Sequence, residues 1–314
     1  HKKTCAPPLP LGEVGGILSV EELFDKVSEA HEADDWQGVL KWEGRMEELM
    51  KGRPDAYCDT ILEAFLRAHE IARAETMCRD HALSAIGLQE RRVKLLGNME
   101  RFRDQGEALC SLASHLEFLD KRKEAKTEFQ RARELGAEHG VFSVECEACM
   151  GLGELAVGDG RQEEGVALYR HALEKAPLNE SGEDSCYELN ALEMLIPALF
   201  ETNAISELEP LVVRYRKAAE AESRRGCFCH DELKSRYFSA LLHEAHGKPQ
   251  DAASEVRALL DLLHNNRAAV QDMQGPCEQL LSEARMHLKI LDPEIGEKEL
   301  IKAVTLNLAK LRMG

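Results

Sequence analysis

The sequence has 314 residues and a formal net charge of −17, from 40 Lys and Arg against 57 Asp and Glu. An acidic chain of this kind is repelled by phosphate backbones and anionic lipid surfaces, so we expect no nucleic acid and no membrane as a partner. Aromatic residues make up only 5% of the chain, while Leu, Ala and Glu are abundant. This composition favours helices over sheets, and we predict an all-α protein.

The ten cysteines are scattered along the chain rather than clustered as in a small disulfide-bonded domain. No uninterrupted apolar stretch approaches the length that spans a bilayer. The scattered cysteines favour a reducing compartment, and we expect a cytoplasmic or nuclear protein.

The chain begins with His1 and Cys5, and two of the three residues between them are lysines. This spacing of one helical turn places an imidazole nitrogen and a thiolate on the same side of a tetrahedral zinc ion. The pair resembles the last two ligands of a MYND-type zinc finger. The resemblance implies that the other ligands precede His1 in a longer protein, and that zinc is bound only there, with no cofactor in the remaining residues. A chance pair or a terminal scar is the alternative.

A Pro- and Gly-rich segment follows, as expected after a domain boundary. We therefore divide the chain into the end of a finger (1–5), a linker (6–19) and a helical region (20–314). No second break in composition appears, which favours one elongated helical region over two globules.

Within this helical region, a helix-turn-helix unit recurs with small residues twelve positions apart. Small residues at this spacing let two antiparallel helices approach closely where they cross, and the residues that follow form an apolar stripe. The small-residue pairs are Ala113 and Ala125, Gly153 and Gly165, and Ala240 and Ala252; the residues that follow are Phe129 and Ala132 in the first copy, and Tyr169, Ala172 and the helix-ending Pro177 in the second.

These positions resemble the tetratricopeptide (TPR) pattern, and the stretch from Tyr169 to Pro177 matches it best. The resemblance implies a right-handed superhelical solenoid of about seven antiparallel helix pairs, with the first helix of each pair lining a concave face. The period of 40 to 44 residues exceeds the usual length of about 34. Such lengthened units are similar to those of kinesin light chain and the Pins-type polarity adaptors.

Other copies are less regular. Residues 34–42 resemble a TPR turn and second helix, while residues 57–98 keep the helical periodicity without the small residues. Pro197 falls inside a predicted first helix, where we expect a kink or a slipped register. Residues 273–313 predict two further helices that cap the stack.

Known catalytic motifs are absent: there is no phosphate-binding glycine loop, no His-Glu-x-x-His and no calcium loop. Cys227, Cys229 and His230 form the densest group of soft ligands after the N-terminus. We interpret them as residues of an inter-helix loop, since no complementary pair has a similar spacing; part of a metal or redox site is the alternative. Cys146 and Cys149 are also spaced like ligands, but they fall inside a predicted helix, so we place them in the core.

A concave groove lined by first helices is the predicted binding site. By helical spacing, the residues expected to face it are Glu107, Cys110, Ser114, Glu117, Phe118, Glu147, Met150, Glu154, Lys234, Tyr237 and Leu241. Their acidity favours a basic or amphipathic protein segment as the ligand. The groove lacks the Lys, Asn and Arg set with which some TPR proteins clamp chaperone carboxyl termini, so no such clamp is expected.

The sequence thus predicts a non-catalytic adaptor or scaffold that binds a protein or peptide segment and is attached to a MYND finger. Because MYND fingers also accompany SET-type lysine methyltransferases with helical C-terminal regions, the helical part of such an enzyme is an alternative. A kinesin-light-chain or Pins-type scaffold without a finger is another.

Overall fold

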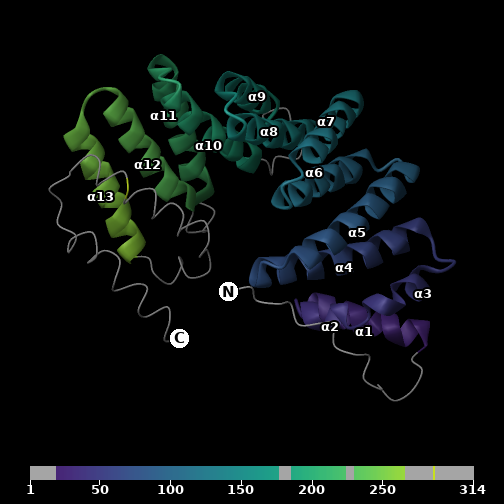
Figure 1. Cartoon of the computed structure of the whole chain (residues 1–314). Helices are drawn as coiled ribbons and strands as arrows, with labels where there is room; N and C mark the ends of the chain where they lie inside the picture. Colours follow the sequence, from purple (N-terminus) through teal and green to yellow (C-terminus); the bar gives the residue numbers. More distant parts are fainter. Residues whose placement is uncertain (1–18, 177–184, 224–229, 266–285, 287–314) are drawn as a thin grey trace. The chain divides into compact units, whose positions relative to one another are not determined.

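The structure is a computed structural model that describes residues 19–176, 185–223, 230–265 and 286, and every secondary-structure element in these residues is helical. Its contacts divide the chain into two compact units, residues 1–155 and 156–314 (Figure 1). The elements that begin in the first unit are α1 (Val20–Glu32), α2 (Trp36–Leu40), the 3-10 helix η1 (Glu43–Arg45), α3 (Met46–Met50), α4 (Asp55–Thr76), α5 (Arg79–Asn98), α6 (Phe102–Phe118), α7 (Arg122–His139) and α8 (Phe142–Gly158). The second unit contains α9 (Gln162–Lys175), α10 (Ser185–Glu201), α11 (Ile205–Ser223), α12 (His230–Ala245) and α13 (Pro249–Asn265).

The first helix begins at a complete capping box. The backbone N–H of Glu22 donates to the Ser19 side chain at 3.2 Å, and the Ser19 N–H donates to the Glu22 carboxylate at 2.8 Å. These two bonds satisfy N–H groups that have no partner inside the helix. Leu23 and Val27, four residues apart, are buried on one side of this helix. They join a core that also contains residues of α2, α3, α4 and α5.

Consecutive helices pack against each other along the chain, with α4 on α5, α5 on α6 and α6 on α7 in the first unit. Turns of two or three residues join these helices, so neighbouring helices run antiparallel. In the second unit, α9 packs on α10, α10 on α11, α11 on α12 and α12 on α13.

The small residues predicted to lie at helix crossings are buried throughout the described residues. Ala113, Ala125, Ala132, Ala172, Ala240 and Ala252 are fully buried, Gly153 and Gly165 are buried, and the aromatic positions Phe129 and Tyr169 are each 3% exposed. The turns also fall where expected, after α8 ends at Gly158 and after α12 ends at Ala245. Pro177 and the predicted capping helices lie outside the described residues, apart from Met286.

The N-terminal copy differs from the expected helical pair. Residues 34–42 resemble a turn followed by one helix, but the structure has the short α2, then η1, then α3. Gly38 and Gly44 lower the helix propensity of this stretch, since glycine costs about 1 kcal/mol relative to alanine in a helix. Further along, α10 continues through Pro197 without interruption.

Two glycines allow α8 to approach its neighbours in the first unit. A Cβ atom on Gly106 of α6 would lie 2.4 Å from a Val144 methyl carbon of α8. A Cβ atom on Gly151 of α8 would lie 2.3 Å from the Phe129 ring of α7, and that ring is only 3% exposed. Both distances are far inside van der Waals contact, so α8 packs directly on α6 and α7 because these positions carry no side chain.

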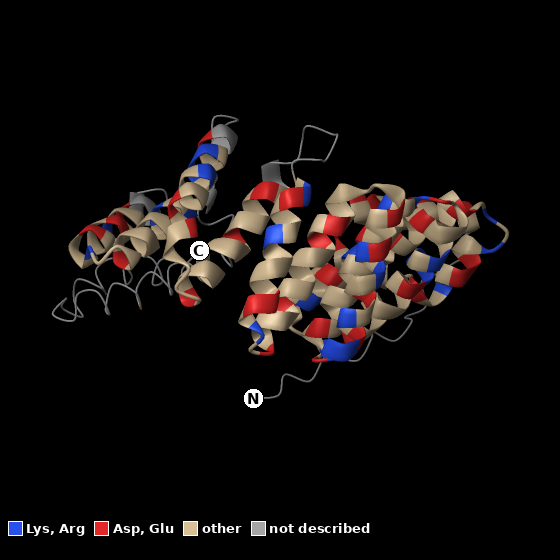
Figure 2. Cartoon of the chain, turned by 90° about the horizontal axis from the view of Figure 1, so that it is seen from above, with Lys and Arg blue, Asp and Glu red and all other residues tan. Residues whose placement is uncertain are grey.

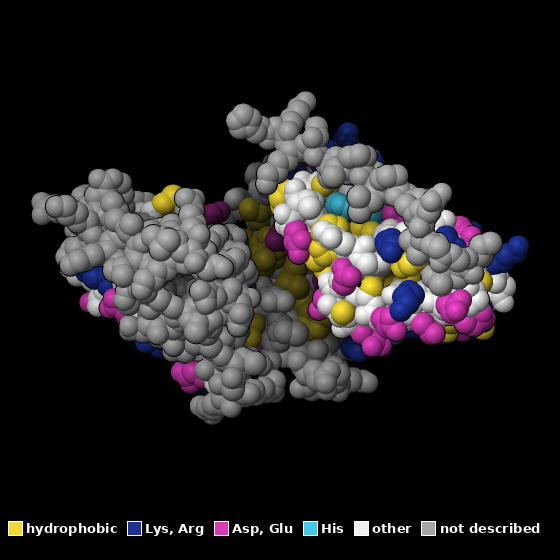
Figure 3. Space-filling model, turned by 90° about the horizontal axis from the view of Figure 1, so that it is seen from below, with side chains coloured by type: hydrophobic (Ala, Val, Ile, Leu, Met, Phe, Trp, Pro, Cys, Tyr) yellow, Lys and Arg dark blue, Asp and Glu magenta, His cyan; other side chains and the backbone are white. Residues whose placement is uncertain are grey.

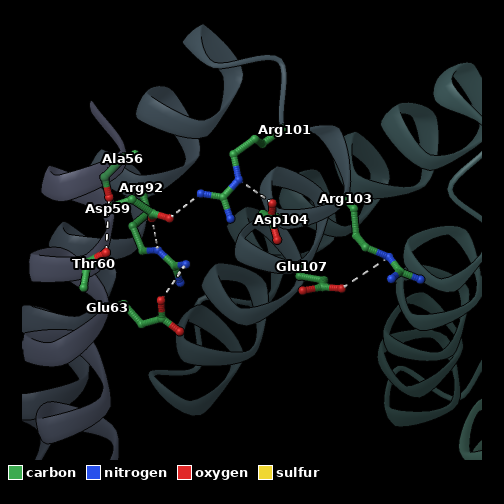
Figure 4. Close-up of polar contacts among 9 residues, drawn as sticks. All are labelled: Ala56, Asp59, Thr60, Glu63, Arg92, Arg101, Arg103, Asp104 and Glu107. Atoms are coloured by element: carbon green, nitrogen blue, oxygen red, sulfur yellow. Dashed lines mark hydrogen bonds and ion pairs between the residues drawn. The ribbon is translucent and has the colours of Figure 1, made fainter. Parts of the chain in front are cut away.

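A buried carboxylate joins three elements near the start of α6 (Figure 4). Asp59 of α4, whose side chain is 5% exposed, accepts a hydrogen bond from Arg92 Nε of α5 at 2.7 Å. Asp59 accepts a second hydrogen bond, 2.9 Å long, from Nη1 of Arg101, the residue just before α6. Arg101 also donates to Asp104 in the first turn of α6 at 2.7 Å. The network therefore fixes α6 relative to α4 and α5.

We expect Gly151→Ala to destabilise the first unit by about 1–3 kcal/mol, because the added methyl group overlaps a buried ring that has little room to move. Gly87→Ala is the control, since a Cβ atom there meets no atom within 4 Å on the exposed side of α5. It should stabilise by about 0.5–1 kcal/mol. Urea unfolding followed by tryptophan fluorescence tests both, because Trp36 and Trp42 are the chain's two tryptophans and both lie in the first unit. Equal effects of the two substitutions would contradict the close contact between Gly151 of α8 and Phe129 of α7.

We expect Asp59→Ala to destabilise the same unit by about 3 kcal/mol, because it leaves the guanidinium of Arg92, 14% exposed, without its principal partner. Glu63→Ala is the control: this carboxylate lies 3.5 Å from Arg92 Nη2 but is 57% exposed. Its loss should cost less than about 1 kcal/mol. The same unfolding measurement compares them, and a cost as large for Glu63 as for Asp59 would show that burial does not set the effect.

Candidate protein-binding face

Four glutamates lie on two neighbouring helices of the first unit, and we call them the acidic face: Glu107 and Glu117 on α6, and Glu147 and Glu154 on α8. Glu147 and Glu154 are seven residues apart, close to two full turns, which places them on one side of α8. Glu107 and Glu117 are ten residues apart, which places them on adjoining sides of α6. Glu147 interacts electrostatically with Glu107, and Glu154 with Glu117. The structure therefore brings together carboxylates from two successive repeats.

Glu147 is the most perturbed carboxyl group of this face. Loss of hydration in its half-buried position, followed by the like charge of Glu107, raises its pKa to about 7. Loss of hydration also raises the pKa of Glu154, with a further contribution from Glu117. The pKa of Glu107 is raised in the same way, while Arg103 and Arg92 act in the opposite direction. The charged forms of these carboxylates are therefore disfavoured in the folded chain.

Elsewhere on the first unit, acidic and basic residues are interspersed along the helices (Figure 2). Many of them form ion pairs, such as Lys121 with Glu124 at 3.2 Å and Lys26 with Glu29 at 2.9 Å. On the acidic face, Glu107 has a distant partner, with Arg103 Nε at 4.0 Å. Among the described residues, Glu147 and Glu154 have no ion pair. Glu147 and Glu154 thus combine the lack of an ion pair with like-charged neighbours on α6.

Hydrophobic side chains separate the charges on the surface of the first unit. Figure 3 shows one face of it, where acidic and basic groups are scattered among apolar ones. A surface of this kind suits an amphipathic segment, since apolar residues can pack between charges.

The remaining groove residues of α6 and α8 contribute in different ways. Cys110 is fully buried and Met150 is 9% exposed, so both belong mainly to the core. Burial raises the pKa of the Cys110 thiol well above its usual range, which keeps it protonated. The Ser114 hydroxyl donates to the Cys110 carbonyl at 3.1 Å. Phe118 lies under the guanidinium of Arg73 of α4, 4.9 Å from the ring centre, so its ring already has a cationic neighbour.

The three groove residues predicted on α12 belong to the second unit. Lys234 pairs with Glu193 of α10, which also accepts a hydrogen bond from the buried Tyr215 hydroxyl at 2.8 Å. Tyr237 is half-buried, and Leu241 is 6% exposed. Lys234 therefore stabilises α10 against α12 in this structure, and Leu241 is a packing residue.

The predicted metal ligands His1 and Cys5 lie outside the described residues, as do Cys227 and Cys229 and the side chain of His230. In the part of the chain that is described, no three His, Cys, Asp or Glu side chains are placed to hold a metal ion. Cys146 and Cys149 are fully buried, as predicted for core positions. Among the described residues, no helix is long and apolar enough to cross a membrane.

The network around Asp59, which positions the start of α6, was not predicted from the sequence. Arg92 and Arg101 are 33 and 42 positions from Asp59, so no local spacing connects these residues. The available signal was an Asp on a helix side otherwise occupied by apolar residues such as Leu62 and Leu66. A carboxylate in that position requires a buried cationic partner.

Comparison with known proteins identifies the fold. No protein-family description and no curated protein matches the sequence. The structure is similar to BtubC (BKLC) from P. vanneervenii, with a TM-score of 0.55, 14% identity, and coverage of 82% of this chain and 94% of that one. The fold is TPR-like. The prediction of an all-α, TPR-like protein is therefore confirmed.

Two further solved structures resemble the chain less closely. One is a kinesin light chain from Podosopora anserina with nearly identical TPR-like repeats, at a TM-score of 0.45 and 16% identity, covering 66% of this chain and 94% of that one. The other is NprR in complex with its cognate peptide NprX, at a TM-score of 0.48 and 11% identity, covering 96% of this chain and 83% of that one.

The pH dependence of stability tests the state of Glu147. Because its pKa is raised to about 7 in the folded chain and is about 4.3 in an unfolded one, folding is favoured below the unfolded value and weakened as pH rises through about 7. We expect Glu147→Gln to remove this loss. The free energy of unfolding of the variant, relative to that of the original chain, should therefore be about 1–3 kcal/mol higher at pH 8 than at pH 5.

Glu134→Gln, at an exposed position on α7, is the matched control for this substitution. It should change the free energy of unfolding by less than about 0.5 kcal/mol at either pH. Tryptophan-monitored urea unfolding at the two pH values gives both results. A Glu147→Gln effect that is the same at pH 5 and pH 8 would exclude a perturbed carboxyl group.

Proposed function

We propose that this chain is a non-catalytic adaptor or scaffold that binds a basic or amphipathic protein segment on the acidic face. The observation that carries the proposal is the pair of carboxylates on α8: Glu147 is half-buried, Glu154 is exposed, and each has a like-charged neighbour on α6. A lysine or arginine side chain placed between α6 and α8 would compensate these charges.

The TPR-like arrangement supports this proposal. Stacked helical pairs expose a row of side chains from successive repeats, and such rows suit extended or helical segments. On the α6–α8 face, Glu107 and Glu147 occupy equivalent positions 40 residues apart, as do Ser114 and Glu154. The repeat therefore presents acidic and small polar groups at regular spacing.

The proposal extends to the longer protein predicted from the N-terminus. There, His1 and Cys5 would supply the last two zinc ligands of a MYND finger, while the helical repeats bind a separate segment. This attachment remains a prediction from sequence, as do the alternatives of a SET-type methyltransferase and of a scaffold without a finger.

Binding of two synthetic peptides tests the proposed face. The first is a short amphipathic peptide of lysine and leucine, and the second has glutamate at every lysine position. We expect the whole chain to bind the lysine peptide more tightly at pH 8, when Glu147 is charged, than at pH 6, and to bind the glutamate peptide very weakly. Fluorescence anisotropy with labelled peptides measures both affinities.

A matched pair of double variants separates this face from the general acidity of the chain. Glu147→Gln with Glu154→Gln should weaken lysine-peptide binding about tenfold, which corresponds to about 1.4 kcal/mol. Glu134→Gln with Glu138→Gln removes the same charge from exposed positions on α7 and should leave affinity nearly unchanged. Equal weakening by both pairs would indicate nonspecific attraction to a chain of charge −17 and would contradict the proposed face.

A further inference from the structure

Two histidines lie next to each other between α4 and α5, and neither belongs to the acidic face. His69 Nδ1 of α4 lies 3.0 Å from His81 Nδ1 of α5. On the other side of its ring, His69 Nε2 lies 2.9 Å from the Glu43 carboxylate of η1. The His69 side chain is only 3% exposed, while His81 is half-buried. We call this arrangement the histidine link.

The distance between the two Nδ1 atoms limits how many protons the link can hold. A hydrogen bond of 3.0 Å requires one nitrogen to donate and the other to accept. If both rings are protonated, both Nδ1 atoms carry hydrogen and neither can accept, so the hydrogen bond is lost and two positive rings lie in contact in a poorly hydrated site. The Glu43 carboxylate accepts from His69 Nε2 and therefore neutralises the charge of that ring, whereas it lies on the far side of His69 from the second ring.

The groups around His81 come from four elements. On α5 its neighbour Asp80 is acidic, on α4 it meets His69, and η1 contributes Glu43. From α2, the Trp36 ring meets His81 edge-on at 6.1 Å, and the Trp36 N–H donates to Glu75 of α4 at 2.9 Å. Loss of hydration, followed by repulsion from His69, lowers the pKa of His81, although Glu43 and Asp80 oppose this.

A metal site would also bring two imidazole nitrogens together. However, no cluster of three potential ligands exists among the residues that the structure describes, and Glu43 lies on the far side of His69 from His81. The geometry is that of a hydrogen bond between rings.

We propose that the histidine link is an acid-sensitive contact that holds η1, α4 and α5 together at neutral pH and opens when both rings become protonated. The link lies next to a core that α1, α2, α3, α4 and α5 share, with Trp36 and Ala68 beside it. A change at the link therefore affects the packing of several helices. Opening would loosen the N-terminal part of the first unit.

The direction of the pH effect follows from the unfolded reference. An unfolded histidine has a pKa of about 6.5, and that of His81 is lower in the folded chain. As pH falls below about 6.5, the unfolded or opened chain takes up a proton before the folded one, so stability is lost until the folded state is protonated too. Each unit of pKa difference makes opening about tenfold more favourable.

Hydrogen exchange of the whole chain, followed by mass spectrometry at pH 7.5 and pH 5.5 and corrected for intrinsic rates, tests the link. We expect peptides from residues 65–90 to lose severalfold protection at the lower pH, and peptides from residues 122–139 to change less. His81→Gln keeps a hydrogen-bonding side chain that does not titrate in this range, so its acid-induced loss should be much smaller. His31→Gln, on α1, is the matched control and should retain the full loss.

An equal loss in the original chain and in His81→Gln would overturn the proposal, as would the absence of any loss in the original chain. If the substitution prevents folding, histidine titration by NMR on the unaltered chain decides. A His81 ring that takes up its proton below about pH 6.5 supports the link. A ring that is protonated at or above that pH overturns it.

Discussion

The position of α6 depends on one buried carboxylate. Asp59 receives Arg92 from α5 and Arg101 from the turn before α6, so a single acidic group holds three consecutive helices in register. Apolar packing alone allows helices to slide and rotate at modest cost, whereas a carboxylate that is buried with two guanidinium groups is satisfied only in one arrangement. Since α6 carries half of the acidic face and packs on α8, the geometry of the proposed binding site follows from this network.

The acidic face illustrates a conflict between stability and binding. Placing Glu147 where hydration is reduced and Glu107 repels it disfavours the folded state at neutral pH. A glutamine would avoid that cost. Charges that destabilise a fold commonly occur at functional sites, where a ligand compensates them. The histidine link differs, because its cost appears only in acid and its partners are all inside the protein.

The sequence predicted the repeats well where small residues mark helix crossings. Ala113 with Ala125, and Ala240 with Ala252, are fully buried because close approach of two helices leaves no room for larger side chains. The groove prediction was less precise, since helical spacing gives the side of a helix but not how deeply a neighbour covers it. Cys110 was therefore assigned to the groove although it is buried.

Features that depend on distant partners could not be predicted in the same way. Trp36 begins a helix that stops after five residues, and its indole N–H reaches Glu75, 39 positions away. Asp59 and the histidine link likewise join residues with no shared local pattern. Tertiary contacts of this kind override local propensity, and a single sequence contains no direct record of them.

The burial of Cys110, Cys146 and Cys149 has a practical consequence. These thiols lie on α6 and α8, the two helices of the acidic face, where a labelling reagent reaches sulfur only after the helices separate. Their reaction rate would therefore record how often this part of the chain breathes, and a ligand that clamps the two helices would slow the labelling. Thiol labelling thus measures the opening of the two helices that carry the proposed binding surface.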